Sequence, residues 1–158
     1  MGSKIISGVK LTSAILILTS YFSCSLNEDN ESVIVTPFQI GKGVLYGAGM
    51  ENIPQQNTVI YDTVTWNELK HKMDSVNNVT GNFTETEIDF SQYIILASFS
   101  EIRPSEGYFI EISSVVEYPD RINVMVTITV PTVPVPAVIT QPYHIVKIPK
   151  TGKEILFN

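Results

Sequence analysis

The sequence SEGYFIEISSVVEYPDRINVMVTITV, residues 105–130, decides the fold class of this chain. In its second half, apolar side chains recur at every other position, at Ile122, Val124, Val126, Ile128 and Val130. A period of two is typical of a half-buried strand, because a helix would spread these side chains around its axis. The first half alternates in the same way at Tyr108, Ile110 and Ile112, and Pro119 favours a turn between the halves. The stretch therefore predicts an antiparallel hairpin whose apolar face needs a cover.

Further short strands are predicted on both sides of this hairpin, over residues 33–40, 58–61, 93–99, 138–148 and 154–157. Pro37 interrupts the first of them and favours an edge strand or a bend in the chain, because proline cannot donate to a strand ladder. Residues 93–99 are almost continuously apolar and are expected to form the central, most buried strand. Gln141 and Pro142 are expected to interrupt the last long strand and to kink it.

One helix is predicted over residues 66–76. Thr65 and Glu68 have the spacing of a capping box, in which each side chain accepts a hydrogen bond from the other residue's backbone N–H. Apolar residues recur at helical spacing and form one stripe, namely Trp66, Leu69, Met73 and Val76. This stripe predicts a helix that lies across a face or an open end of the sheet, followed by a polar loop over residues 77–87.

The predicted elements together define a mainly β fold. With 158 residues and a hydrophobic content of 44%, the chain can form one globular domain, which we expect over residues 33–158. About seven short strands and one short helix favour a small antiparallel β-sandwich or a partly open barrel.

The first 24 residues have the three parts of a secretory signal. Lys4 and Lys10 supply the positive region, residues 11–18 are apolar, and a short uncharged segment leads to Cys24, the single cysteine of the chain. The apolar part is shorter than the roughly 20 residues that a transmembrane helix needs. Cys24 stands where a bacterial lipoprotein is cleaved and acylated, so we expect it to carry lipid. The alternative is a conventional signal peptide that leaves a free thiol.

A lipidated Cys24 would place the protein in the cell envelope. Its acyl chains would anchor the protein in the outer membrane, at the periplasmic or the cell-surface face. Residues 25–32 are polar and acidic and suit a flexible tether between the anchor and the domain. With no second cysteine, the domain cannot form an internal disulfide and depends on its apolar core.

Charge and motif content argue against several functional classes. The formal net charge is −6 and no cluster of lysine and arginine occurs, so nucleic acid is not an expected partner. The glycines at positions 41–49 precede a polar loop rather than a helix start, and should serve bends rather than a phosphate site. His71 and His144 lack metal-ligand spacing, and no Gly-x-Ser-x-Gly motif is present. We therefore expect no enzymatic activity, no metal and no cofactor.

From about residue 46 to residue 157, the chain resembles the C-terminal domain of the PrcB-like family, described as protease complex subunits. The likeness rests on short motifs at residues 66–69, 88–90, 103–108 and 138–149. In the family, the loop before the tyrosine usually reads Gly-x-x-Pro-Thr-Gly-Gly-Tyr. Here Ser105 and Glu106 replace the threonine and one of the paired glycines, and the first glycine of the pattern is also replaced. The resemblance implies a non-catalytic envelope domain that binds or stabilises a protease.

Two loops, residues 101–107 and 131–142, are the candidate binding surface. Loops that proline stiffens on a β scaffold lose little conformational entropy on binding, which suits the recognition of a partner. The candidate residues are Arg103, Pro104, Ser105, Glu106, Gly107, Tyr108, Pro134, Gln141, Pro142 and Tyr143. A positive φ is expected at Gly107, where the chain turns into the hairpin. The alternative is that Gly107 and Pro142 only shape the ends of strands.

Two other functions remain open on the sequence. The Pro-x-x-Gly-Tyr loop also resembles, more weakly, the inhibitory loop of chagasin-type cysteine-protease inhibitors. A glycan-binding or cell-wall-binding module is the other alternative. It requires Tyr46, Tyr118 and Tyr143 to line one exposed face.

Overall fold

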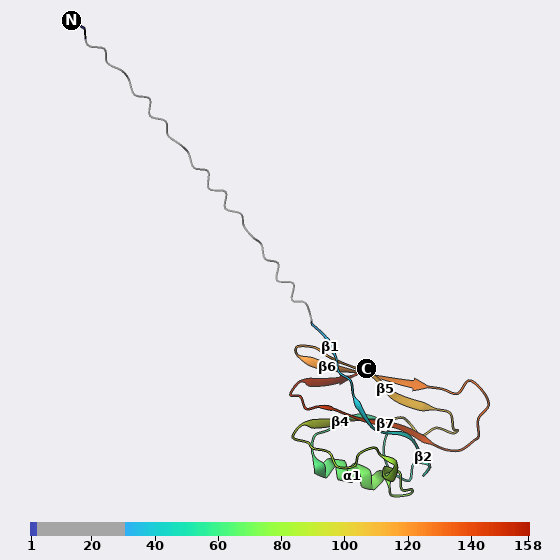
Figure 1. The fold of residues 1–158 in the computed structure, drawn as a ribbon. Helices are drawn as coiled ribbons and strands as arrows, with labels where there is room; N and C mark the ends of the chain where they lie inside the picture. Colours follow the sequence, from blue (N-terminus) through green and yellow to red (C-terminus); the bar gives the residue numbers. More distant parts are fainter. Residues whose placement is uncertain (3–30) are drawn as a thin grey trace.

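The computed structural model describes residues 1–2 and 31–158, so the expected signal segment, Cys24 and most of the acidic tether lie outside the described residues. In the described part, eight strands form two four-stranded sheets that pack face to face (Figure 1). One α-helix covers the outer face of the second sheet. The predicted mainly β fold is confirmed as a β-sandwich with one short helix.

The first sheet, named the hairpin sheet, has the strand order β1-β5-β6-β8. Its strands are β1 (Val33–Ile34), β5 (Phe109–Glu117), β6 (Arg121–Thr129) and β8 (Glu154–Phe157). The second, named the helix-side sheet, has the order β2-β7-β4-β3. Its strands are β2 (Phe38–Leu45), β3 (Gln56–Ile60), β4 (Tyr93–Phe99) and β7 (Gln141–Pro149). Two helical elements, α1 (Thr63–Met73) and the 3₁₀ turn η1 (Thr80–Asn82), lie between β3 and β4 in the chain.

The predicted hairpin is confirmed as the antiparallel pair β5–β6. A bulge between Ile112 and Ser114 shifts the register, so that Ile112 and Val115 both face the other sheet. The predicted apolar face is nevertheless only half covered. Ile128 is 44% exposed and Val130 is 55% exposed, because the two sheets separate towards this end of β6. A groove opens there. Residues of β3, β4, β5 and β6 line it, including Asn57 and Ile128.

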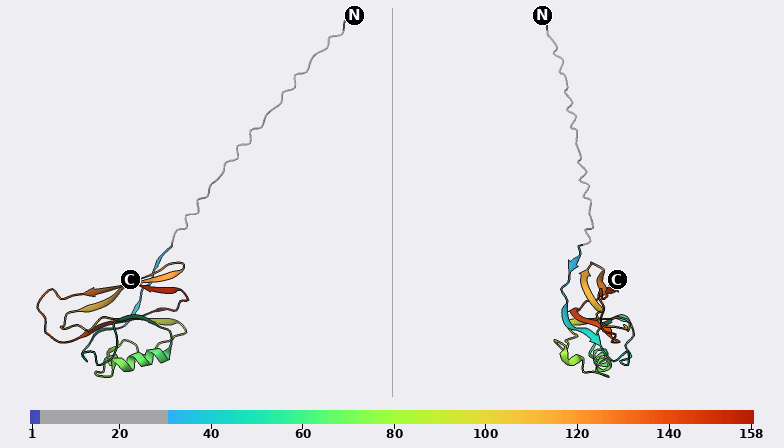
Figure 2. Two further views of the ribbon diagram at one scale, coloured as in Figure 1. Left: turned by 180° about the vertical axis from the view of Figure 1, so that it is seen from behind. Right: turned by 90° about the vertical axis from the view of Figure 1, so that its right-hand side faces the viewer.

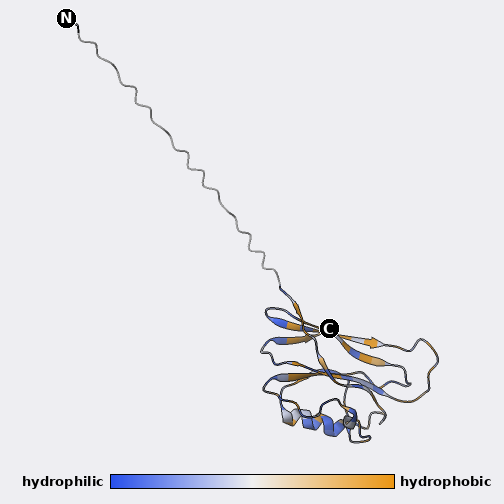
Figure 3. Cartoon of the chain, viewed as in Figure 1, coloured by the Kyte–Doolittle hydropathy of each residue, from blue (hydrophilic) through white to orange (hydrophobic). Residues whose placement is uncertain are grey.

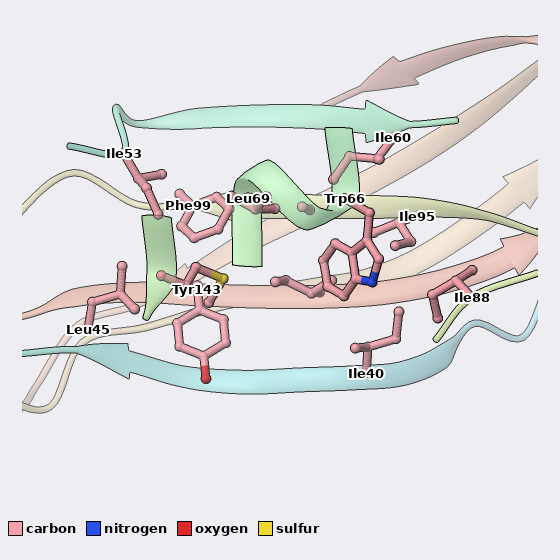
Figure 4. Packing of buried hydrophobic residues seen from close by; sticks show 13 residues of the cluster. Ile40, Leu45, Ile53, Ile60, Trp66, Leu69, Ile88, Ile95, Phe99 and Tyr143 are labelled. Carbon is pink, nitrogen blue, oxygen red and sulfur yellow. The ribbon is translucent and has the colours of Figure 1, made fainter. Parts of the chain in front are cut away.

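Each of the two faces of the helix-side sheet packs into its own core. Strand β4 is buried on both sides, as its continuous apolar run predicts. Ile94 and Leu96 join a cluster between the two sheets, whereas Ile95 and Phe99 join a cluster beneath α1. Figure 4 shows this second cluster, in which Trp66 lies between the helix and the strands.

Helix α1 begins earlier than predicted and has a different cap. The Asp62 carboxylate accepts hydrogen bonds from the backbone N–H of Thr65 at 2.8 Å and from its hydroxyl at 2.9 Å. The predicted capping box of Thr65 and Glu68 is therefore wrong, because the helix starts upstream of Thr65 and Asp62 accepts from the Thr65 N–H that Glu68 was expected to bind. The helix ends at Met73, and Val76 lies beyond it and is exposed, not part of the apolar stripe. The outward side of α1 is largely hydrophilic (Figure 3).

Trp66 holds α1 on the sheet, as predicted. Its ring is buried and stacks on Phe83 with a centroid distance of 6.0 Å. The indole N–H donates to the Thr86 carbonyl at 2.9 Å, so the polar atom of the ring is satisfied. Gly41 lies in β2 beneath the same cluster, where a Cβ would come within 2.4 Å of the Phe83 ring. The glycines at 41–49 thus serve close packing and a turn, and no helix begins directly after them.

Two features of the topology differ from the simplest antiparallel arrangement. Pro37 marks the point where the chain leaves the hairpin sheet after β1 and enters the helix-side sheet as β2, which is the bend that its sequence predicts. Strand β8 pairs with β6 in parallel. After β6 the chain crosses to the other sheet, reverses as β7 and returns, and the two reversals restore the direction of β6 (Figure 2). No helix in the described residues is long and apolar enough to cross a bilayer.

Candidate functional site

The two predicted binding loops meet at one end of the sandwich. Arg103 and Thr140 exchange two backbone hydrogen bonds, of 2.7 and 3.0 Å, and the Glu106 N–H donates to the Pro136 carbonyl at 3.1 Å. The Thr140 hydroxyl also donates to the Ser105 carbonyl at 3.1 Å. We name this end, formed by residues 46–55, 100–108 and 130–140, the loop end. It is the right-hand end of the molecule in Figure 1. The structure thus brings together two loops that are separated by the whole β5–β6 hairpin.

Gly107 has the predicted left-handed conformation, with a φ of 82°. A Cβ at this position would lie 2.9 Å from the Cβ of Pro131 and 3.1 Å from a methyl carbon of Val135. Glycine is therefore required both by the backbone and by the close approach of the proline-rich loop. Gly107 shapes the start of β5 and at the same time joins the two loops.

Arg103 is fully engaged within its own loop. Its guanidinium pairs with Glu101 at 2.7 Å, its Nε donates to the Ser100 hydroxyl at 3.2 Å, and the group lies 4.7 Å from the centre of the Tyr108 ring. The cation–π interaction holds the Tyr108 ring in place, and the other two contacts fix the guanidinium. Arg103 is thus a positioning residue of the loop, and Pro104 beside it is exposed.

A pocket of about 170 Å³ opens at the loop end. Three of the predicted residues line it, Glu106, Gly107 and Tyr108, together with Val44, Tyr46, Phe109 and Thr140. Tyr46 is 54% exposed and Phe109 is 52% exposed, so aromatic surface is accessible at the mouth. Sequence reasoning missed Val44 and Phe109. Phe109 is an apolar residue on the polar face of β5, and this break in the alternation was the signal that could have found it.

The predicted binding residues Gln141, Pro142 and Tyr143 are buried, and their assignment to an exposed surface is wrong. Pro142 does not interrupt β7 but lies inside it, opposite Val44 of β2. Its carbonyl accepts from the Ser100 N–H at 2.9 Å, but proline has no N–H to return to the Ser100 carbonyl.

The side chain of Gln141 replaces this missing donor. Its amide nitrogen donates to the Ser100 carbonyl at 3.0 Å and to the Ile53 carbonyl at 2.8 Å. A central strand can therefore hold a proline without leaving a buried carbonyl unpaired. The Gln-Pro pair is a structural device that fastens β7 to the loops on both sides of it.

Tyr143 belongs to the core beneath α1. Its ring packs against Phe99 and Phe83, with centroid distances of 6.1 and 6.2 Å, and burial raises the pKa of its hydroxyl. It is not available to a ligand.

The proline-rich loop exposes several side chains at the loop end. Pro134 is exposed, as expected for a contact residue, and exposed apolar residues flank the same region, namely Ile102, Val133, Val138 and Ile139. Several exposed apolar side chains in one region indicate a place where a partner can bury them, whereas a single exposed apolar residue is common on any protein surface.

His144 has a structural role between the sheets. Its Nδ1 accepts a hydrogen bond of 2.9 Å from the backbone N–H of Ile112, which lies at the bulge of β5. Burial, with a smaller effect from Lys42, lowers the pKa of His144 to about 4, so the ring is neutral at pH 7. His71 is exposed on α1. In the part of the chain that the structure describes, no three side chains of His, Cys, Asp or Glu gather as metal ligands.

The fold and this end of it define a class of protein: a β-sandwich domain that presents a loop-built surface at one end. Residues 94–149 match the family model described as PrcB C-terminal. This part of the chain is therefore similar to the PrcB C-terminal domain, in agreement with the resemblance in its sequence motifs. The match runs from β4 through the hairpin and the proline-rich loop to the end of β7, a narrower range than the expected 46–157. No curated protein and no solved structure matches the chain.

Proposed function

We propose that this protein is a non-catalytic, lipid-anchored domain of the cell envelope that binds and stabilises a protein partner, with a protease as the leading class. The observation that carries the proposal is the direct joining of the two predicted loops into one surface. The PrcB C-terminal match supports an association with a protease complex in general.

The loop end is suited to protein recognition because it is accessible, partly apolar and stiff. Three prolines restrict the backbone of residues 131–137. The Glu106 N–H fixes this loop at Pro136, and Arg103 fixes the chain just after it at Thr140. A surface that is already ordered loses less conformational entropy on binding, so more of the contact energy appears as affinity. Exposed Val133 and Ile139 supply apolar area that a partner can bury.

The position of the loop end also suits an N-terminal anchor. Strand β1 pairs with Val116 and Glu117, at the hairpin-turn end of β5. The loop end lies at the other end of β5, beyond Phe109. If Cys24 is lipidated in the outer membrane, the domain presents its loops away from the attachment point.

The geometry weakens the glycan-binding alternative. Tyr143 is buried, and the two remaining tyrosines lie at opposite ends of the sandwich. Tyr46 follows β2 at the loop end, whereas Tyr118 lies in the turn between β5 and β6. They cannot line one face. The chagasin-type alternative predicts that the captured partner is a cysteine protease, which the experiment below would identify.

The test is capture of partners from envelope extract by the full-length protein in mild detergent, followed by chemical cross-linking and mass spectrometry. We expect Glu106→Lys and Pro134→Ala to weaken capture without lowering the melting temperature, since both residues are at least partly exposed and only the Glu106 backbone is hydrogen-bonded. Glu154→Lys, an exposed charge reversal on β8, is the matched control. Equal capture by all four proteins would contradict binding through the loop end.

The anchor is tested separately. Metabolic labelling with a palmitate analogue should mark the protein, and Cys24→Ala should abolish the label. A label that persists in the Cys24→Ala variant would show that Cys24 is not the lipidation site.

A further inference from the structure

Resting on the proposed partner binding, we infer that the pocket at the loop end receives a lysine or arginine side chain of the partner protein. The pocket combines one carboxylate, that of Glu106, with the exposed aromatic rings of Tyr46 and Phe109. This combination matches a side chain that has an apolar stem and a cationic head.

The first argument is charge. Among the described residues, Glu106 has no salt-bridge partner. Arg103 in the same loop is already paired with Glu101 at 2.7 Å, and Lys42 on β2 is paired with Glu111 at 2.7 Å. A cation from outside is therefore the group that Glu106 lacks. The formal net charge of −6 also favours a basic partner over an acidic one.

The second argument is the chemistry of the walls. Val44 and Phe109 provide apolar surface for the methylene stem of a lysine or arginine side chain, which such residues bury while the charge stays near water. The faces of exposed aromatic rings attract a cation within about 6 Å of their centres. Tyr46 is free for this contact, whereas Tyr108 already holds Arg103.

The third argument is the rigidity of the pocket. Gly107 is packed against Pro131, and Thr140 is tied to Ser105 and Arg103, so the floor cannot easily collapse or widen. A pocket of about 170 Å³ accepts one side chain rather than a whole peptide segment. The specificity therefore lies in one inserted residue, and the exposed apolar side chains around the mouth supply the remaining contact.

The experiment uses short peptides as probes of the full-length protein in detergent micelles. Acetylated and amidated Gly-Lys-Gly and Gly-Arg-Gly are titrated against Gly-norleucine-Gly, which keeps the stem and lacks the charge. Binding is followed by the amide NMR signals of Gly107, Phe109 and Thr140. We expect both cationic peptides to shift these signals, with an affinity that falls as salt rises from 50 to roughly 300 mM, since exposed ion pairs are screened.

Glu106→Gln retains the shape of the side chain and removes its charge. It should weaken both cationic peptides about fivefold, the upper end for an exposed ion pair, and should remove most of the salt dependence. Tyr46→Ala should weaken all three peptides. Glu154→Gln makes the same change of net charge far from the pocket and should leave binding unchanged. Unaltered binding in Glu106→Gln, or equal binding of the norleucine peptide, would overturn the inference.

The two proposals fail in different ways. If the full-length protein captures a partner and Glu106→Gln captures it equally, the loop end binds a protein but the basic-residue pocket is wrong. If cationic peptides bind as described and no partner is captured from envelope extract, the pocket stands and the proposed function does not.

Discussion

Removal of the Gln141 side chain should destabilise the domain, although this residue is a member of the motif that the sequence favoured as a binding site. Its amide nitrogen makes two buried hydrogen bonds, to the carbonyls of Ser100 and Ile53, and the residue is 1% exposed. The variants of choice are Gln141→Ala and Gln141→Met, since methionine nearly retains the volume and removes both donors.

The magnitude follows from three contributions. Each lost hydrogen bond costs about 1 kcal/mol, and each carbonyl left unpaired in the interior adds to that cost. The Oε1 atom of Gln141 is buried and has no donor among the described residues, so its removal offsets part of the loss. We expect Gln141→Met to lose about 1–2 kcal/mol of the free energy of unfolding. Gln141→Ala also leaves a cavity and should lose about 2–4 kcal/mol.

The assay is equilibrium unfolding in urea, with Gln55→Ala as the control because Gln55 is exposed in the neighbouring loop. The control should change the free energy of unfolding by less than about 0.5 kcal/mol. A loss in Gln141→Ala as small as in the control would refute the structural role. Reduced partner capture at full stability would instead make Gln141 a contact residue.

Three further predictions concern stability and are checked by the same unfolding assay. Trp66→Ala should lose about 3–5 kcal/mol, because the buried indole fills the core beneath α1; a loss below about 1 kcal/mol would contradict that packing. Gly107→Ala should lose about 1–3 kcal/mol, because alanine is strained at a φ of 82° and its Cβ would meet Pro131; unchanged stability would show that the loop adapts. The pKa of His144 in the folded protein is about 4, below its ordinary value of 6.5. Between pH 6.5 and about 4, this imidazole is therefore protonated in the unfolded state and neutral in the folded state. The free energy of unfolding should therefore fall by about 1–2 kcal/mol from pH 7 to pH 5, and the fall should be smaller in His144→Asn. The same pH dependence in both proteins would contradict a buried neutral imidazole.

The strands could be predicted because their signal is local. Alternation at Ile122 and Val124 and the continuous apolar run of residues 93–99 report burial directly, and both were placed correctly. The helix was found for the same reason, since Trp66, Leu69 and Met73 share one face. The predicted ends of the helix were less accurate. Capping depends on which nearby carboxylate accepts from the free N–H groups, and here Asp62, not Glu68, accepts from the Thr65 N–H.

The candidate site was predicted only in part, because the sequence alone does not show whether a proline lies in an exposed loop or inside a buried strand. Pro104 and Pro134 are exposed as expected, but Pro142 is inside β7. Gln141 compensates for the missing proline N–H through hydrogen bonds to Ser100 and Ile53, which are 41 and 88 residues away in the chain. Contacts over such distances in the sequence leave no periodic pattern, and only the fold reveals them.

The arrangement of the two ends of the sandwich restricts what the partner can be. Strand β5 has nine residues, and at about 3.3 Å per residue it separates the loop end from β1 by roughly 25 Å. If Cys24 carries the anchor, the pocket with Glu106 lies at the end of the domain opposite to the strand that the tether enters. A partner that reaches this end can approach from the aqueous side, and a water-exposed basic side chain of an envelope protein fits both the position and the charge of the pocket.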